Sequence, residues 1–139
     1  MATNVDRSAI HRQRAADLIE LRKFERAAQE ARRALHLHPD DADAYRLLAW
    51  ALWGQGELSR AESAARSALR LAPDEADVHS TLALILAGRG KRQEAREHHE
   101  RAITLAPTVA GLHTRYARFL LEEIDWTMEI VAEGIQTIP

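Results

Sequence analysis

Seven histidines are the side chains most able to do chemistry in this 139-residue chain, because imidazole nitrogens bind metal ions and accept protons. His98 and His99 are adjacent, and adjacent side chains on a helix point about 100° apart, so they form a poor chelating pair. His36 and His38 are two residues apart and share no helix face either. We therefore predict that the chain holds no metal ion, and nothing else in the sequence predicts a cofactor.

Two groups of carboxylates, within residues 40–43 and 74–77, have the chemistry of acids and bases. Each group follows a proline and precedes an apolar-periodic segment, where carboxylates cap a helix and interact favourably with its positive end. The glutamates and arginines between residues 92 and 101 are typical of a solvent-exposed salt-bridge face. The chain has no phosphate-binding glycine loop with lysine, no nucleophile elbow and no metalloprotease motif. We therefore predict that it is not an enzyme.

The elements that carry these side chains repeat every 34 residues. Pro39, Pro73 and Pro107 mark the period, and the residues between them align without a gap. Gly-x-Gly breaks at residues 54–56 and 88–90 divide the second and third units into two apolar-periodic segments each. A period of this length is the signature of a solenoid built from helix–turn–helix units.

Within each unit the apolar spacing predicts two short helices. Ser8 is the expected N-cap of the first helix, which leaves residues 1–7 as a flexible N-terminus. Residues 59–62 resemble a capping box for the fourth helix. The expected helices span about residues 8–22, 24–37, 42–53, 59–71, 74–87, 92–105 and 109–121.

Composition narrows the class of protein further. Hydrophobic residues make up 46% of the chain and aromatic residues only 5%, which suits closely packed helices better than a β-sandwich. The net charge of −2 argues against a nucleic-acid-binding surface. The chain has no cysteine, its apolar runs are too short to span a membrane, and its N-terminus has no secretory signal. A cytoplasmic location is the default expectation.

Small and large residues recur in phase with the prolines. Counting each repeat from residues 8, 42, 76 and 110, position 8 is always alanine and position 11 is always leucine, while positions 20 and 27 are alanine in the first three repeats. In this pattern the chain resembles the tetratricopeptide repeat family. The resemblance implies an all-α, right-handed superhelical solenoid of antiparallel helix pairs. Its parts would be full repeats at 8–41, 42–75 and 76–109 and the first helix of a fourth at 110–121.

The resemblance also implies a function, since first helices of successive repeats in this family line a concave groove that binds peptides. We therefore expect a protein–protein interaction scaffold or adaptor whose groove holds a peptide or helix with apolar and acidic residues. Trp50 and Trp53 share one helix face, so either they form an aromatic groove floor or they pack in the core between repeats. The expected groove residues are Arg12, Ile19, Arg46, Trp50, Trp53, Ser80, Leu84, Arg118 and Leu121.

Two further points follow from the resemblance. Some family members clamp a C-terminal carboxylate, but Ala16 and Leu47 stand where their asparagines would be, so we expect no chaperone-tail clamp. His11, His79 and His113 share repeat position 4, a packing position in the family, and are expected to be structural. An RNA-binding helical repeat is a remote alternative function, against which the net charge argues.

The tail at residues 122–139 departs from the repeat pattern. Asp125 is an expected N-cap for a separate amphipathic helix that ends near Ile135. The tail is then a cap on the solenoid, a sign of a longer repeat array, or a segment that docks on another copy. The third hypothesis rests on charge, because residues 1–38 carry +3 and residues 107–139 carry −3, and it would make the protein a homo-oligomer. Its self-docking residues would be Trp126, Met128, Val131 and Ile135.

Overall fold

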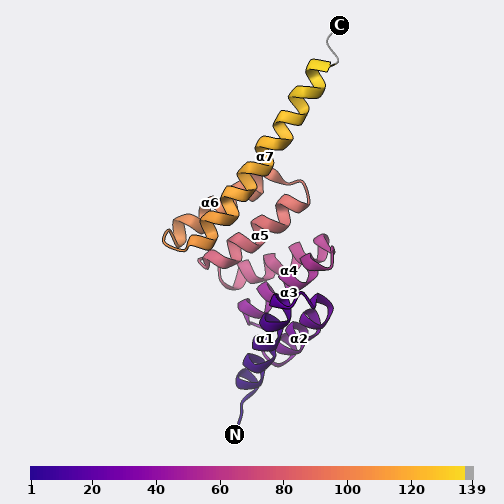
Figure 1. The fold of residues 1–139 in the computed structure, drawn as a ribbon. Coiled ribbons are helices and arrows are strands. Elements are labelled where there is room, and N and C mark those ends of the chain that lie inside the picture. Colours follow the sequence, from indigo (N-terminus) through magenta and orange to yellow (C-terminus); the bar gives the residue numbers. More distant parts are fainter. Residues whose placement is uncertain (137–139) are drawn as a thin grey trace.

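The structure, a computed structural model, describes the backbone of residues 1–136 and the side chains of residues 1–134. This part of the chain forms seven α-helices and no strand (Figure 1). The helices are α1 (Asn4–Glu20), α2 (Phe24–Leu37), α3 (Ala42–Gly54), α4 (Leu58–Leu71), α5 (Ala76–Gly88), α6 (Arg92–Leu105) and α7 (Ala110–Gln136).

Consecutive helices pair as α1 with α2, α3 with α4 and α5 with α6, and the pairs stack one after another (Figure 1). Helix α7 packs on α5 and α6 as the first helix of a fourth unit. The start of α1 and the end of α7 therefore lie at opposite ends of an elongated molecule (Figure 1). The predicted all-α solenoid of helix pairs is confirmed.

Most of the buried apolar residues are alanines. Ala15, Ala49 and Ala83, which share repeat position 8, are completely buried. Larger side chains fill the space that the alanines leave, and Leu82 and Leu86 on α5 are fully buried in the middle of the stack. An alanine at a helix contact brings two backbones close together, so each unit can pack tightly on both of its neighbours.

The turn inside each repeat depends on one residue in the left-handed conformation. Gly56 and Gly90 have φ angles of 78° and 79°, and Arg22 takes the same place in the first repeat with a φ of 59°. Ile124 stands at this position in the fourth repeat, and a β-branched residue is strongly disfavoured there. The helix consequently does not turn, and α7 continues for 27 residues. The expected break with an N-cap at Asp125 is wrong.

The start of α1 also differs from the expectation. The helix begins at Asn4 because Thr3 and Asp6 form a capping box, so residues expected to be flexible are helical. Ser8 is not an N-cap: it is buried, and its hydroxyl donates a hydrogen bond of 2.9 Å to the carbonyl of Ala34.

Two other helices begin at residues that differ from the expected ones, and one expected N-cap is confirmed. Helix α4 begins at Leu58 after Glu57, which makes no side-chain capping bond, so the capping box expected at residues 59–62 is wrong. Helix α5 begins at Ala76, later than expected. Asp41 caps α3 as predicted, since its carboxylate accepts a hydrogen bond from the amide of Ala44.

A buried carboxylate ties the second repeat to the third. Glu62 on α4 is 8% exposed and accepts hydrogen bonds from Arg66, Arg89 and Lys91. Burial alone would raise the pKa of Glu62, but the hydrogen bonds from Lys91 and Arg66 outweigh it and lower that pKa. Two of the three donors lie at the turn of the third repeat, so the charge contact fixes one unit against the next.

Helix α7 is held on α6 by aromatic stacking and by charge. His99 on α6 is buried, and its ring lies 5.6 Å from that of Tyr116 and 5.1 Å from that of Phe119. Arg96 pairs with Glu123. The guanidinium of Arg92 lies 5.3 Å from the centre of the Trp126 ring. These contacts hold α7 on α6 as far as Trp126, and the end of the helix projects beyond the stacked helices (Figure 1).

Gly54 and Gly88 occupy the same place in successive repeats, but only one of them has room for a methyl group. A Cβ at Gly54 would lie 2.4 Å from the Phe24 ring, whereas a Cβ at Gly88 would meet Leu58 at 3.4 Å. We expect Gly54→Ala to lower the free energy of unfolding by about 1–3 kcal/mol through overpacking. Gly88→Ala should raise it by up to about 1 kcal/mol through helix propensity. Urea unfolding of both variants tests this, and equal effects would contradict the assigned packing.

His99 should make the fold sensitive to acid. Burial, with smaller effects from Arg115 and His98, lowers the pKa of His99 from 6.5 to about 4. Between these two values the unfolded chain binds a proton that the folded chain does not, so stability falls as pH drops through that window. The loss attributable to His99 should approach about 3 kcal/mol. Urea unfolding at several pH values should show a shallower decline for His99→Phe, and an unchanged slope would contradict the assignment.

Candidate peptide-binding surface

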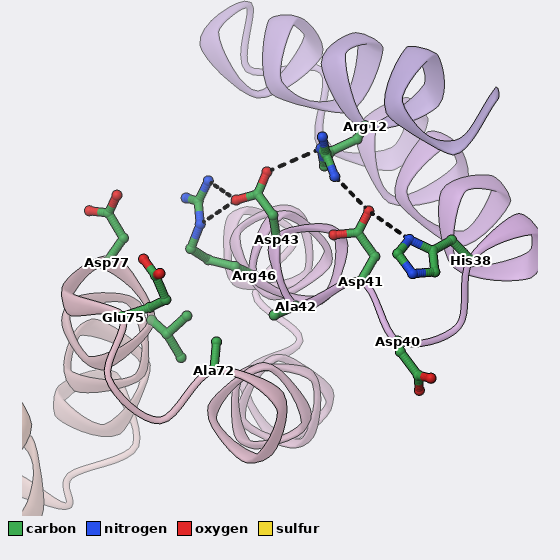
Figure 2. A pocket seen from close by; sticks show the side chains of 11 residues that line it. Arg12, His38, Asp40, Asp41, Ala42, Asp43, Arg46, Ala72, Glu75 and Asp77 are labelled. Atoms are coloured by element: carbon green, nitrogen blue, oxygen red, sulfur yellow. Dashed lines mark hydrogen bonds and ion pairs between the residues drawn. The ribbon is translucent and has the colours of Figure 1, made fainter. Parts of the chain in front are cut away.

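The first helices of the first three repeats meet at a pocket of about 480 Å³ (Figure 2). It is formed by α1, by the loop before α3, by the first turn of α3, and by the start of α5. The carboxylates are here because helix N-termini favour them, and the repeats place successive N-termini side by side. The lining residues are Arg12, His38, Asp40, Asp41, Ala42, Asp43, Arg46, Ala72, Glu75, Asp77 and Val78.

Both arginines of the pocket are already paired within the chain. Arg12 donates a hydrogen bond of 2.8 Å to Asp41 and lies 3.4 Å from a carboxylate oxygen of Asp43. Arg46 donates two hydrogen bonds, of 3.0 and 2.6 Å, to the same oxygen of Asp43. Figure 2 shows these side chains as one connected network. Arg12 and Arg46 therefore line the pocket, but carboxylates of the same chain neutralise their charges.

The remaining carboxylates of the pocket have no such partner. Within the described residues, the side chains of Asp40, Glu75 and Asp77 make no hydrogen bond or ion pair. Glu75 and Asp77 lie on the side of the pocket that faces Arg46 and Asp43 (Figure 2). Five carboxylates against two guanidinium groups give the lining a formal charge of −3 with histidine neutral. The pocket is suited to a cation.

The same helices carry an aromatic surface, which consists of Trp50 and Trp53 on α3 and Leu84 on α5. The rings of Trp50 and Trp53 meet edge to face with their centres 5.3 Å apart, and both side chains are half-buried. Trp53 packs against the core, as does the half-buried Ile19 on α1. Leu84 on α5 is also half-buried. Each tryptophan thus has one part buried in the fold and another part open to solvent.

Arg115 joins the aromatic surface from α7. Its guanidinium lies 5.2 Å from the centre of the Trp50 ring, and it donates a hydrogen bond of 3.0 Å to the hydroxyl of Ser80. Burial lowers the pKa of Arg115, nearby Arg46 acts in the same direction, and Asp77 opposes them. Arg115 of the fourth repeat therefore contacts Trp50 of the second repeat and Ser80 of the third, and its charge also interacts with Asp77 of the acidic pocket.

Comparison with known proteins identifies the fold family. The tetratricopeptide repeat family model matches residues 12–76 and 46–110, which together cover more than half of the chain. The chain belongs to the tetratricopeptide repeat (TPR) family. A comparison with curated proteins gives no match.

Solved TPR domains share this architecture. The first TPR domain of Spaghetti (RPAP3), bound to the HSP90 peptide SRMEEVD, has a TM-score of 0.77 at 15% identity and covers 88% of this chain and 97% of its own. The first TPR domain of human RPAP3 has a TM-score of 0.75 at 14% identity, and the match covers 94% of this chain and 97% of that domain. The Sgt2 TPR domain from Aspergillus fumigatus has a TM-score of 0.77 at 15% identity, and the match covers 88% of this chain and 82% of that one. At such low identity the likeness shows the fold alone.

The TPR positions expected to line the groove are not all accessible. Ser80 is 1% exposed beneath Arg115, so its expected role as a contact residue is wrong in this conformation. Arg115 itself was missed, because it stands at repeat position 6, where the other repeats carry Gln13, Leu47 and Thr81. The residues at repeat position 6 show no periodic pattern. Arg115 covers Ser80 because its long side chain extends from the fourth repeat onto the third.

The expected residues on α7 lie on two different faces. Arg118 and Leu121 are exposed, and so are Met128 and Val131. Trp126 instead lies on Arg92 of α6. Ile135 belongs to the helix backbone, but its side chain lies outside the described residues.

The histidines of the TPR positions are engaged by the fold. The Nε2–H of His79 donates to the carbonyl of Pro73 at 2.7 Å, which leaves its Nδ1 to accept a hydrogen bond from Nδ1 of His98 at 2.9 Å. Burial, and then the neighbouring His79, lowers the pKa of His98. No group of three or more potential ligands that could hold a metal ion occurs among the described residues. The same part of the chain contains no helix long and apolar enough to cross a membrane.

Arg12 should prove to be a structural residue of the TPR domain. Asp41 is 5% exposed, and removing Arg12 would leave this carboxylate buried without its main counter-charge. We expect Arg12→Ala to lower the free energy of unfolding by about 1–3 kcal/mol. Arg14→Ala, which removes an exposed arginine from the same helix, should change it by less than about 0.5 kcal/mol. Chemical denaturation measures both, and equal values would contradict a structural role for Arg12.

Proposed function

We propose that this TPR protein is a non-enzymatic interaction module that binds a peptide or helix bearing a basic residue and apolar residues. The basic residue would enter the acidic pocket, and the apolar residues would cover Trp50, Trp53 and Leu84. The observation that carries this proposal is the unpaired carboxylates of Glu75 and Asp77 at the start of α5, in a pocket whose helices α3 and α5 also carry the half-buried Trp50, Trp53 and Leu84 further along.

The charge of the pocket changes the ligand that the sequence predicts. An acidic ligand would need free arginines, but Arg12 and Arg46 are already bonded to Asp41 and Asp43. To bind them, an anionic ligand would have to displace carboxylates that the chain itself supplies. A lysine or arginine would instead meet Glu75 and Asp77 without displacing anything, and charge-assisted hydrogen bonds of this kind are the stronger ones.

The aromatic surface would supply most of the binding energy. Burying apolar area contributes roughly 25 cal/mol per Å², and tryptophan is enriched among the residues that dominate interfaces. Trp50 is held by its contacts with Trp53 and Arg115, so a ligand would meet a surface that is already ordered. A preformed surface avoids the entropy cost of fixing long side chains on binding.

The bound peptide of a structural neighbour illustrates a different chemistry on the same fold. The first TPR domain of Spaghetti is bound to SRMEEVD, a peptide whose last four residues include three acidic side chains. Such a tail would be repelled by a pocket of −3, and Ala16 and Leu47 replace the asparagines of the carboxylate clamp. The same repulsion argues against RNA as the ligand, because its backbone is a polyanion.

A random-peptide library displayed on phage and selected on the purified protein tests the proposal. Enriched peptides should combine at least one lysine or arginine with apolar residues. A synthetic copy of the best peptide should bind with an affinity that Asp77→Asn lowers about threefold to tenfold, through loss of one charge contact. Trp50→Ala should lower it more, and tryptophan fluorescence or calorimetry measures both effects.

Asp74→Asn is the matched control for the charge. Asp74 lies next to the pocket in sequence but does not line it, and its side chain is largely exposed. The control should leave peptide affinity unchanged and should leave its salt dependence unchanged too. Enrichment of acidic peptides, or equal effects of Asp74→Asn and Asp77→Asn, would refute the proposed ligand.

A further inference from the structure

One face of α7 carries an apolar stripe that the described chain leaves uncovered. Leu121, Ile124, Met128 and Val131 are 51–64% exposed, and Ala117 is exposed with them. The opposite face of the helix carries Phe119, which is packed on α6. Beyond the contacts of Glu123 with Arg96 and of Trp126 with Arg92, the rest of α7 projects away from the stacked helices (Figure 1), and a helical segment of this length is marginal in water without a partner.

The spacing of the stripe specifies what kind of element covers it. The steps from Ala117 to Leu121, Ile124, Met128 and Val131 alternate between four and three residues, which is a heptad spacing. Thr114 extends the series on one side, and Ile135 extends it on the other in sequence. A seam of this period matches the side of another α-helix, so the occupant is a helix rather than an extended peptide.

The charge and size of the residues along α7 then specify which helix. Residues 110–121 carry two arginines and no carboxylate, whereas residues 122–136 carry five carboxylates and no basic residue. The seam is small in the first half, at Thr114 and Ala117, and large in the second half. The two halves are therefore complementary to each other in both charge and volume, which is the arrangement that a self-pairing antiparallel helix requires.

We propose that two copies of this chain dimerise through α7, with the two helices antiparallel along the stripe. Aligning Leu121 with the second copy's Ile124 also places Ala117 against Met128 and Thr114 against Val131. The alignment is centred at the middle of α7, so the helices overlap over nearly their whole length, about 40 Å. A parallel pair would instead set carboxylates against carboxylates and stack Ala117 on its own copy, leaving a gap.

Flanking charges support the same register. Arg118 and Asp125 lie one heptad apart on the same side of the stripe, and both are exposed without a partner among the described residues. In the antiparallel alignment each Arg118 faces the second copy's Asp125, so the twofold axis generates two such pairs. Arg118 and Leu121, which the sequence assigns to the groove, thereby belong to the dimer interface.

The first experiment measures the mass of the full chain in solution by light scattering over a concentration series. The wild type should approach twice the chain mass, and Met128→Glu should have the mass of one chain. Ile130→Glu is the matched control, because Ile130 is similarly exposed on the same helix but lies on the opposite face from the stripe. It should remain dimeric, and circular dichroism should show that both variants keep their helices. A monomeric wild type, or a dimer that survives Met128→Glu, would overturn the proposal.

Cysteine cross-linking distinguishes the antiparallel register from any other, since the native chain has no cysteine. The double variant Ala117→Cys/Met128→Cys should form a disulfide-linked dimer under mild oxidation. Neither single variant should do so, because each position lies far from its own copy in this register. Cross-linking of Met128→Cys alone would indicate a parallel pair and would overturn the antiparallel assignment. Peptide binding at Trp50 should persist in Met128→Glu, so failure of the dimer and failure of the peptide site are separable.

Discussion

The close approach of helices at alanine is the constraint on which the rest of the structure depends. Ala15, Ala49 and Ala83 have no exposed surface, and all three occupy the same position in successive repeats. A larger side chain at these positions would separate the repeats and shift every later unit along the stack. The 34-residue period is therefore a packing requirement, and the side chains that could bind something are confined to the positions that the contacts do not use.

That confinement explains why the acidic pocket and the aromatic surface lie together. Carboxylates gather at helix N-termini because they cap the helix and interact with its dipole, as Asp41 does on α3. Stacked repeats place successive helix N-termini side by side. The carboxylates that stabilise each helix locally therefore together produce a negative electrostatic potential at one edge of the first helices. Arg12 and Arg46 neutralise part of it, and the part left over, at Glu75 and Asp77, is where the proposed ligand would bind.

The repeats and their helices were predictable because each signal occurs several times in phase. Features that occur once were not. The capping box of Thr3 and Asp6 lies outside the repeat pattern, and the ion pairs that occupy Arg12 become visible only when Asp41 and Asp43 are placed beside it. The burial of Ser80 under Arg115 likewise depends on a side chain from the next repeat, at a position with no periodic signature.

The single residue Ile124 connects the two proposed functions. Glycine or a strained arginine turns the chain at this place in the other repeats, and isoleucine does not, so α7 runs straight and leaves uncovered the face that a second helix of the fourth repeat would have covered. The first half of the same helix supplies Arg115 to Trp50. A dimer through α7 would thus hold two peptide surfaces at a fixed separation, since each is anchored to the shared helix pair. A partner with two suitable segments would then bind the second one intramolecularly, and its avidity would exceed the affinity of either surface alone.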